Sequence, residues 1–388
     1  MPLTSENAAL APELYDREEQ KGRATLSNRI IEAFQPQVFN ATGYPVHVRS
    51  EAELWRYVDV MHETRLKSTV EDLLQGLTPD EFALFQRAVR FIIDFTTMTF
   101  GRPLRCENAL MRAMGIFRYI RAAQPKRVME FGPGSGYLGL LHILDGISYI
   151  GVENTQAFYL LQNRMWSAAA KSGFCELASE PMSLRDVTAR LDDYQAVHIP
   201  WWKIIDVEPA ELPLAVDLVT ANHCLAEMQD SAMKYYVRMS YAALKNTRAP
   251  VIFEGWGYEL LRSRGFVARE FDATGFRMCH VEERVVAYSS DPAISDYQVL
   301  PRTTSVREKF RSMSRRVLRL ETIMHGYEIA SYTGTNPLSA FVRATQENAK
   351  KAATVGYGEV IAFLASVYGE KNPSQEERFL ERIGKSYL

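Results

Sequence analysis

Two hydrophobic patterns alternate along this chain of 388 residues. Before residue 124, apolar residues recur at spacings of three and four, which is the period of an amphipathic helix. Between residues 126 and 288, short apolar runs alternate with helix-length segments, a pattern typical of βαβ units and a mainly parallel sheet. From residue 302 onward the pattern is helical again. We therefore expect an α/β core between two helical segments.

Local signals sharpen these boundaries. The tetrapeptide Thr78-Pro79-Asp80-Glu81 combines a capping side chain, a proline and two acids, as a helix start does. The predicted helices before the core span residues 52–62, 66–75, 79–100 and 109–122. The predicted strands span residues 127–131, 148–152, 195–199, 216–221, 251–254 and 283–288. The chain then divides into a flexible leader (1–24), an N-terminal helical cap (25–123), a core (124–300) and a C-terminal helical extension (301–388).

Composition narrows the class of protein. With 47% hydrophobic and 24% charged residues, the chain has ordinary globular usage rather than that of a disordered protein. Its 45 basic and 47 acidic residues leave no surplus for neutralising phosphates, so we predict no nucleic-acid partner. The most apolar stretch, residues 83–100, is interrupted by Arg87, Arg90 and Asp94, which predicts a core helix and no membrane span.

The four cysteines, Cys106, Cys175, Cys224 and Cys279, lie far apart in the sequence. No C-x-x-C pair and no tight Cys/His spacing occurs, so we predict neither a zinc site nor a disulfide framework, and no metal. The N-terminal residues lack the basic-then-apolar run of a secretory signal. A cytoplasmic location fits these unpaired thiols.

One segment carries candidate chemistry. Gly132, Gly134 and Gly136 occupy alternate positions between the strand at 127–131 and an apolar helix that begins near Leu138. Such glycines let the backbone approach a ligand closely and let the helix pack on the strand. We interpret the turn as a ligand seat, although a glycine turn that only ends a strand is the alternative.

Two cofactors fit this turn. Gly134, Gly136 and Gly139 match the dinucleotide pattern G-x-G-x-x-G, with Glu153 as the acid that binds ribose. However, Glu130 stands where a dinucleotide-binding strand is normally apolar. Either cofactor needs Glu153 for the same reason, because a carboxylate offers two acceptor oxygens to a vicinal diol.

The arrangement E-x-G-x-G-x-G, from Glu130 to Gly136, resembles motif I of class I S-adenosylmethionine-dependent methyltransferases. The resemblance implies a Rossmann-like, mainly parallel seven-stranded sheet. It also implies that Glu130 and the glycine turn hold the methionine end of S-adenosylmethionine, and that Glu153 binds both ribose hydroxyls. The segments GPGSGYLG, YIGVENTQAFYL, HIPWW and NHCLAEM together resemble bacterial sugar O-methyltransferases, over roughly residues 107–288.

The later strands add candidate residues. Trp201 follows the strand near which the class I fold places adenine; it either flanks that ring or seals the edge of the core. The segment 216–228 resembles motif IV, which implies that Asn222 lies at the cofactor and that His223 and Glu227 face the acceptor. Glu254 ends the next strand on the same rim.

The acceptor decides the catalytic chemistry. A hydroxyl must lose its proton as the methyl arrives, and His223 is the candidate base, unless a structural hydrogen bond occupies it. A cationic amine or guanidine, such as free arginine, instead needs carboxylates and aromatic faces. The candidates for that second chemistry are Glu227, Glu254, Glu283, Trp201, Trp202 and Trp256. We favour a hydroxyl of a small, sugar-like metabolite and leave the nitrogen acceptor and an NAD(P)-dependent oxidoreductase as alternatives.

The helical flanks have two interpretations each. Arg102, Arg105, Glu107 and Asn108 either contact the cofactor or acceptor, or cap and connect helices. The basic stretch from residue 307 to residue 319 suggests either an anionic partner or a solvated helix face. A homodimer contact through the C-terminal helices is left open by the pattern.

Overall fold

The structure of this chain is a computed structural model. It describes residues 10–35, 46–50, 52–55, 76–170, 173–211, 214, 216–225, 227–244, 249–255, 264–281, 285–291, 299–301, 327–329, 347, 351–352 and 354–368. The predicted helix at 66–75 lies outside these residues, as do Trp256 and Glu283.

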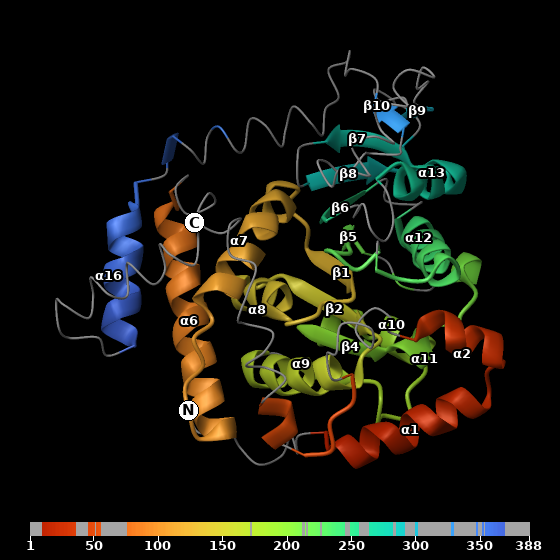
Figure 1. The fold of residues 1–388 in the computed structure, drawn as a ribbon, viewed down its shortest axis with the longest axis horizontal. Coiled ribbons are helices and arrows are strands. Elements are labelled where there is room, and N and C mark those ends of the chain that lie inside the picture. Colours follow the sequence, from red (N-terminus) through yellow and green to blue (C-terminus); the bar gives the residue numbers. More distant parts are fainter. Residues whose placement is uncertain are drawn as a thin grey trace, which may run out of the picture.

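A mainly parallel sheet forms the centre of the described residues, with the strand order β3-β4-β2-β1-β5-β6-β8-β7 (Figure 1). Only β8 runs antiparallel to its neighbours β6 and β7. The strands are β1 (Arg127–Phe131), β2 (Ser148–Glu153), β3 (Phe174–Glu176), β4 (Ala196–Pro200), β5 (Leu218–Thr220), β6 (Pro250–Glu254), β7 (Arg277–Val281) and β8 (Val285–Ser289).

The predicted number of seven strands is wrong, because this sheet has eight. The short strand β3 adds itself to the edge beside β4. Three residues are too few to form a recognisable alternation, so no sequence pattern predicted it. The strand β7 also has no counterpart among the predicted strands, because Arg277 and His280 interrupt its apolar run.

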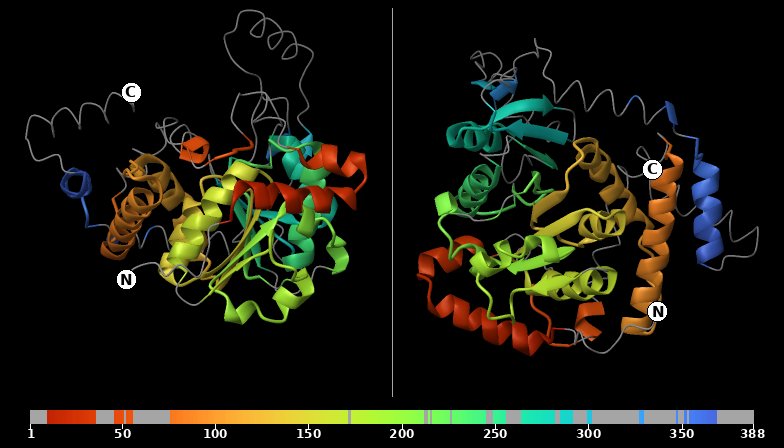
Figure 2. Two further views of the ribbon diagram at one scale, coloured as in Figure 1. Left: turned by 90° about the horizontal axis from the view of Figure 1, so that it is seen from below. Right: turned by 180° about the vertical axis from the view of Figure 1, so that it is seen from behind.

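Helices cover both faces of the sheet (Figure 2). On one face, α9 (Gln156–Ala169) is buried along nearly its whole length, because α1 (Pro12–Ala24) and α6 (Pro79–Phe100) pack against it as well as the sheet. The helices of this face are α8 (Tyr137–Asp145) and α9 (Gln156–Ala169), and those of the other are α12 (Asp230–Leu244) and α13 (Arg264–Thr274). Two short helices, α10 (Leu184–Thr188) and α11 (Trp201–Ile204), flank β4.

The direction of winding reverses between β1 and β5. Strands β2, β4 and β3 lie on one side of β1, whereas β5, β6, β8 and β7 lie on the other. Open α/β sheets bind ligands at such a switch point, outside the carboxyl ends of the strands. Glu130 near the end of β1 and Asn222 just after β5 lie at this point.

The two long helices of the predicted cap form as the sequence indicates. Helix α6 (Pro79–Phe100) begins with a capping box, in which Thr78 Oγ1 accepts from the Glu81 N–H at 3.2 Å and Glu81 accepts from the Thr78 N–H at 2.9 Å. Helix α7 (Glu107–Ala122) is joined to α6 by Arg118, which donates to both oxygens of Glu81 at 2.9 Å.

The sequence predicts a flexible leader over residues 1–24, but Pro12–Ala24 forms helix α1 and Asn28–Phe34 forms helix α2. Tyr15 is 0% exposed and its ring lies 4.9 Å from that of Trp202 and 5.0 Å from that of Tyr159. Helix α1 packs on α9 and α11, and α2 packs on α12. Burial of these aromatic rings orders the segment, since each contributes a large apolar surface.

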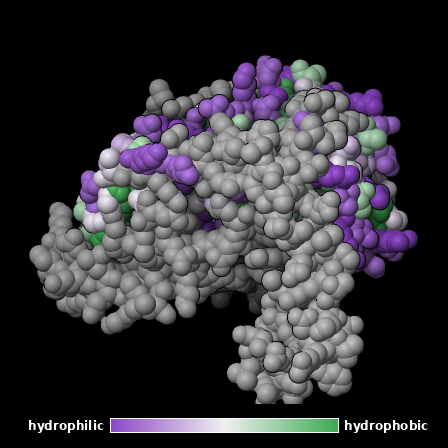
Figure 3. Space-filling model, turned by 90° about the horizontal axis from the view of Figure 1, so that it is seen from above, coloured by the Kyte–Doolittle hydropathy of each residue, from purple (hydrophilic) through white to green (hydrophobic). Residues whose placement is uncertain are grey.

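Among the described residues of the C-terminal extension, Tyr357–Val367 forms helix α16, which packs on α6. Tyr327–Ile329 forms strand β10 where the sequence predicts helix, and it pairs antiparallel with β9 (Val299–Pro301). On the face seen in Figure 3, the described surface is mostly hydrophilic and its apolar residues are scattered. Among the helices of the described residues, none has the length and apolar character needed to cross a bilayer.

Candidate functional site

The turn between β1 and α8 takes a conformation that requires glycine. Gly132, Gly134 and Gly136 have φ angles of 63°, 57° and 75°, in the left-handed region that glycine enters without steric cost. A Cβ at Gly132 would lie 2.8 Å from the Cβ of Cys224. A Cβ at Gly134 would meet no atom of the described residues within 4 Å, so the backbone there is open to close approach by a ligand.

Helix α9 holds this turn from behind. Gln162 Nε2 donates to the Gly134 carbonyl at 2.6 Å, and Trp166 Nε1 donates to the Gly136 carbonyl at 2.9 Å. A Cβ at Gly136 would lie 2.8 Å from Gln162 Cγ, so helix and turn are in close contact. The turn is therefore fixed before any ligand arrives.

Glu153, the last residue of β2, points its carboxylate at this turn. Its Oε2 accepts from the Gly134 N–H at 3.2 Å and from Gln162 Nε2 at 2.9 Å. Its Oε1 accepts from the N–H groups of Asn154 and Thr155 at 2.8 and 2.9 Å. Burial raises the pKa of this carboxyl, and the four hydrogen bonds oppose that rise. The result is a desolvated, oriented acceptor beside the open backbone of Gly134.

Glu130 lies beneath the turn and is 2% exposed. Its Oε2 accepts from the Tyr149 hydroxyl at 2.5 Å and its Oε1 accepts from Asn222 Nδ2 at 3.0 Å. Burial raises the pKa of Glu130 to about 7, although both hydrogen bonds lower it. In this structure its carboxyl links β1, β2 and the segment after β5.

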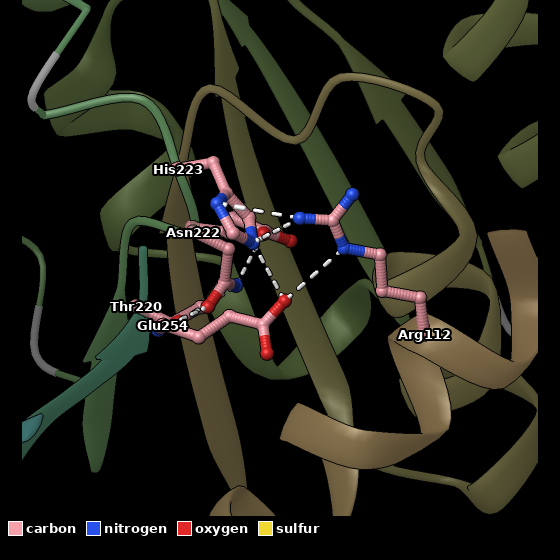
Figure 4. Close-up of polar contacts among 6 residues, drawn as sticks. Arg112, Thr220, Asn222, His223 and Glu254 are labelled. Carbon is pink, nitrogen blue, oxygen red and sulfur yellow. Dashed lines mark hydrogen bonds and ion pairs between the residues drawn. The ribbon is translucent and has the colours of Figure 1, made fainter. Parts of the chain in front are cut away.

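Asn222 joins three neighbouring strands (Figure 4). Its Nδ2 donates to Glu130 and, at 3.0 Å, to Thr220 Oγ1, and its Oδ1 accepts from the Glu254 N–H at 3.1 Å. All of these partners belong to the protein. Asn222 therefore connects β1 and β5 at the switch point and also bonds to the backbone of β6 at Glu254.

His223, Glu254 and Arg112 form a polar cluster at the carboxyl ends of β5 and β6 (Figure 4). His223 Nε2 lies 2.6 Å from Glu254 Oε1, and Arg112 donates from Nε to the same oxygen at 3.4 Å. An Arg112 terminal nitrogen lies 2.7 Å from His223 Nε2 and 3.4 Å from Nδ1. The sequence thus placed His223 and Glu254 on one rim, and the structure brings them into contact.

Backbone geometry fixes the imidazole in this cluster. His223 has a φ of 60°, which is uncommon for a residue with a side chain, and its N–H donates to the Glu254 carbonyl at 3.0 Å. A Cβ at Gly255 would lie 2.0 Å from His223 Nδ1, so the ring occupies space that only glycine leaves free. A strained backbone and a glycine neighbour therefore set the position of one side chain.

Glu254 and Arg112 make opposite demands on His223 Nε2. A carboxylate only accepts hydrogen bonds, so the 2.6 Å contact with Glu254 needs a proton on Nε2, whereas the guanidinium of Arg112, 2.7 Å from the same nitrogen, only donates. When the ring bonds to Glu254, Nε2 carries the proton and Arg112 is held by its ion pair with Glu254. Burial of Glu254 disfavours its charge, but His223 and Arg112 outweigh that effect, and the pKa of Glu254 lies below its ordinary value. Glu254 is therefore an anion that can stabilise a second proton on the imidazole.

Other predicted residues lie elsewhere. Glu227 is half-buried in the turn after β5, where its N–H donates to the Cys224 carbonyl at 3.0 Å. Trp201 is 2% exposed, donates from Nε1 to Glu19 at 2.9 Å and stacks on Phe34 at 6.2 Å. Its surroundings are those of a residue that seals the edge of the core, with α1 and α2 covering it.

The polar residues before the core connect helices. Arg102 lies over the ring of Trp55 at 3.9 Å and Arg105 over that of Tyr368 at 5.0 Å. Glu107 accepts from the Tyr368 hydroxyl at 2.9 Å. The residue of this region that reaches the site is Arg112, which the sequence interpretation missed, because an arginine on an amphipathic helix has no distinguishing local signal.

One further group of ligand-type atoms occurs in the described residues. Atoms of Asp16, Glu19 and His47 lie within 4.8 Å of one another. Asp16 already accepts from Gln156 at 2.7 Å, and Glu19 accepts from Trp201 and Arg23. These bonds attach α1 to the core, so we assign no metal to the group.

No protein-family profile and no curated protein matches the chain. Among solved structures it is similar to a TehB-like SAM-dependent methyltransferase from Corynebacterium glutamicum, at 12% identity and a TM-score of 0.28, covering 46% of this chain and 87% of that chain. It is also similar to magnesium protoporphyrin IX methyltransferase from Synechocystis PCC 6803, at 10% identity and a TM-score of 0.32, covering 55% and 100%. A ribosomal protein L11 methylase from Lactobacillus delbrueckii gives 18% identity, a TM-score of 0.28 and coverages of 48% and 79%. Values this low identify neither an activity nor a ligand for this chain.

Proposed function

We propose that this chain is an S-adenosylmethionine-dependent methyltransferase that acts on a hydroxyl of a small, sugar-like molecule. One observation carries the proposal: a glycine turn with an open backbone at Gly134 faces the oriented carboxylate of Glu153 at the switch point of the sheet. The His223–Glu254 pair lies at the carboxyl ends of the adjacent strands. This combination supplies a binding site for a nucleoside and, beside it, a base.

The residues at the turn fit S-adenosylmethionine, which supplies an electrophilic methyl group when it is bound. Glu153 would hold the ribose hydroxyls, although its four protein hydrogen bonds already use its acceptor sites. Binding of a diol therefore exchanges or lengthens some of these bonds. Glu130 and the backbone from Gly132 to Gly136 would form the floor beneath the methionine end.

His223 is the proposed base. In the proposed mechanism, Nδ1 takes the proton from the acceptor hydroxyl while Nε2 keeps its proton in the hydrogen bond to Glu254. The Glu254 anion stabilises the imidazolium that forms, and the positive φ of His223 holds the ring in place. Arg112, whose terminal nitrogen lies 2.7 Å from Nε2 and 3.4 Å from Nδ1, has to move off the ring for this step while it keeps its ion pair with Glu254.

The same contacts favour oxygen over nitrogen as the acceptor atom. Glu254 is the best-placed carboxylate for a cationic amine or guanidine, but Arg112 already pairs with it. A second cation there would meet a compensated charge. The alternative of a dinucleotide is disfavoured for a different reason, because the acid Glu130 lies buried on β1 where a dinucleotide-binding strand is normally apolar.

Calorimetric titration tests the proposal directly. The purified chain is titrated with S-adenosylhomocysteine and, separately, with NAD and NADP. We expect S-adenosylhomocysteine to bind and neither dinucleotide to do so. In a second assay, with S-adenosylmethionine as the methyl donor, we expect sugars and other polyols from a panel to be methylated. Binding of NAD or NADP without S-adenosylhomocysteine would make the chain an oxidoreductase, and methylation confined to amines would move the acceptor to nitrogen.

A further inference from the structure

Behind the glycine turn lies a buried chain of polar groups with no role in the proposed mechanism. Gln162 of α9 and His198 of β4 are both 0% exposed. Gln162 Nε2 donates to the Gly134 carbonyl at 2.6 Å and to Glu153 Oε2 at 2.9 Å, and its Oε1 lies 2.9 Å from His198 Nε2. One amide thus contacts the turn, the carboxylate proposed to bind the ribose and a buried imidazole.

The proton positions in this hydrogen-bonded series of groups have a single solution. The carbonyl of Gly134 and the carboxylate of Glu153 can only accept, so the NH₂ group of Gln162 must face them. Its Oε1 then faces His198, which must donate from Nε2. Burial lowers the pKa of His198 well below its ordinary value, so the imidazole stays neutral and keeps this one donor.

Packing prevents these hydrogen bonds from rearranging. The His198 ring stacks on Tyr159, with centroids 3.7 Å apart and planes at 9°. His198 Nδ1 is buried and has no hydrogen-bond partner among the described residues, so a flipped ring would lose its bond to Gln162 as well. His198 therefore holds the Gln162 amide in one orientation, and the NH₂ group of that amide in turn positions Glu153.

We propose that Gln162, oriented by His198, is a positioning residue that holds Glu153 and the glycine turn in the arrangement that recognises the ribose hydroxyls. This inference rests on the proposed function. Its basis is that one side chain makes two contacts, each to a different half of the proposed cofactor site. A loose carboxylate would lose affinity for a diol, because two hydroxyls must meet it in one geometry.

A matched control exists on the same helix. Gln156 is 2% exposed and also makes three hydrogen bonds, donating to Asp16 Oδ1 and the Val48 carbonyl and accepting from the Val48 N–H. None of these partners belongs to the turn or to Glu153. Gln162→Met and Gln156→Met therefore remove equal numbers of buried hydrogen bonds from α9 and differ in what those bonds hold.

The experiment compares S-adenosylhomocysteine affinity in the wild type and both variants by calorimetry. We expect Gln162→Met to weaken binding at least about tenfold, as loss of a hydrogen bond to a charged group does. We expect Gln156→Met to stay within about twofold of the wild type. Equal affinities for the wild type and Gln162→Met would overturn the inference.

A second readout separates positioning from general loosening. S-adenosylhomocysteine and its 2′-deoxyribose counterpart differ in one of the two hydroxyls that Glu153 would bind. In Gln162→Met the preference for the ribose form should shrink toward unity, whereas a loosened protein would lose both ligands in equal proportion, which contradicts positioning.

His198→Phe covers the case in which Gln162→Met does not fold. It keeps a ring for Tyr159 but removes the donor to Gln162, so we expect about a threefold loss of affinity and a reduced ribose preference. An unchanged preference in a folded His198→Phe would contradict the role of His198. If the wild type itself binds no S-adenosylhomocysteine, the proposed function fails, which is distinct from failure of this inference.

Discussion

Glu153 is the residue on which cofactor recognition most depends. Its carboxylate is buried, oriented by four donors and close to the open backbone at Gly134. Glu153→Ala should weaken S-adenosylhomocysteine binding by more than about 1.5 kcal/mol, because charge-assisted hydrogen bonds to a diol are lost. Calorimetry measures the effect. Glu176→Ala, at the end of β3, is the control and should leave affinity unchanged, because β4 separates β3 from β2; equal losses in both variants would remove Glu153 from the site.

His223 should affect turnover rather than cofactor binding. We expect His223→Ala to lower kcat at least about a hundredfold, the effect of removing a general base, with S-adenosylhomocysteine affinity preserved. His223→Asn is a useful companion, because asparagine tolerates the left-handed φ of 60° that alanine resists. Both variants should be slow, but the asparagine variant should melt at the higher temperature. A variant with wild-type kcat would show that the acceptor needs no imidazole.

Glu130 should make the stability of the protein depend on pH. Its folded-state pKa of about 7 lies above the ordinary 4.5, so the folded state keeps a proton that the unfolded state has lost. The stability that this proton contributes is complete below about pH 4.5 and is lost as pH rises through about 7. Glu130→Gln lacks the titration, so the free energy of unfolding of the wild type relative to the variant should fall by about 2 kcal/mol from about pH 5 to about pH 8. Denaturant unfolding at the two pH values measures it, and parallel profiles would contradict it.

Local signals predicted some elements better than others. Helix α6 carries its own start signal in Thr78 and Glu81, and both residues cap it in the structure. Helix α1 has no comparable signal: its residues are ordered by Trp202 and Tyr159, which come far later in the chain. The strands β3 and β9 are each three residues long, so neither builds up a period that a sequence pattern could reveal.

Helix α1 supplies a test of order at the N-terminal end of the described residues. Tyr15→Ala should lower the free energy of unfolding by about 3 kcal/mol, because it leaves a cavity between two aromatic rings. Tyr15→Phe keeps the ring and should unfold close to the wild type. Denaturant unfolding with tryptophan fluorescence measures both. Identical unfolding of the wild type and Tyr15→Ala would restore the prediction of a flexible leader.

At the scale of the whole molecule, the sequence predicts some residues of the site and misses others. Glu130, the three glycines and Glu153 follow one another within two strands, so their spacing predicted a shared site. Arg112 reaches His223 from α7, across 111 positions, and Gln162 meets His198 across 36 positions. No local period encodes such contacts, because tertiary packing alone brings these elements together.

The position of α1 and α2 also bears on biosynthesis. These helices pack on α9, α11 and α12, the last of which ends at Leu244. A ribosome adds roughly 5 to 20 residues per second, so about ten seconds or more separate the appearance of Tyr15 from that of its last neighbours. During that interval the aromatic side chains of the first two helices are exposed, and a chaperone that shields nascent apolar segments would find its target there.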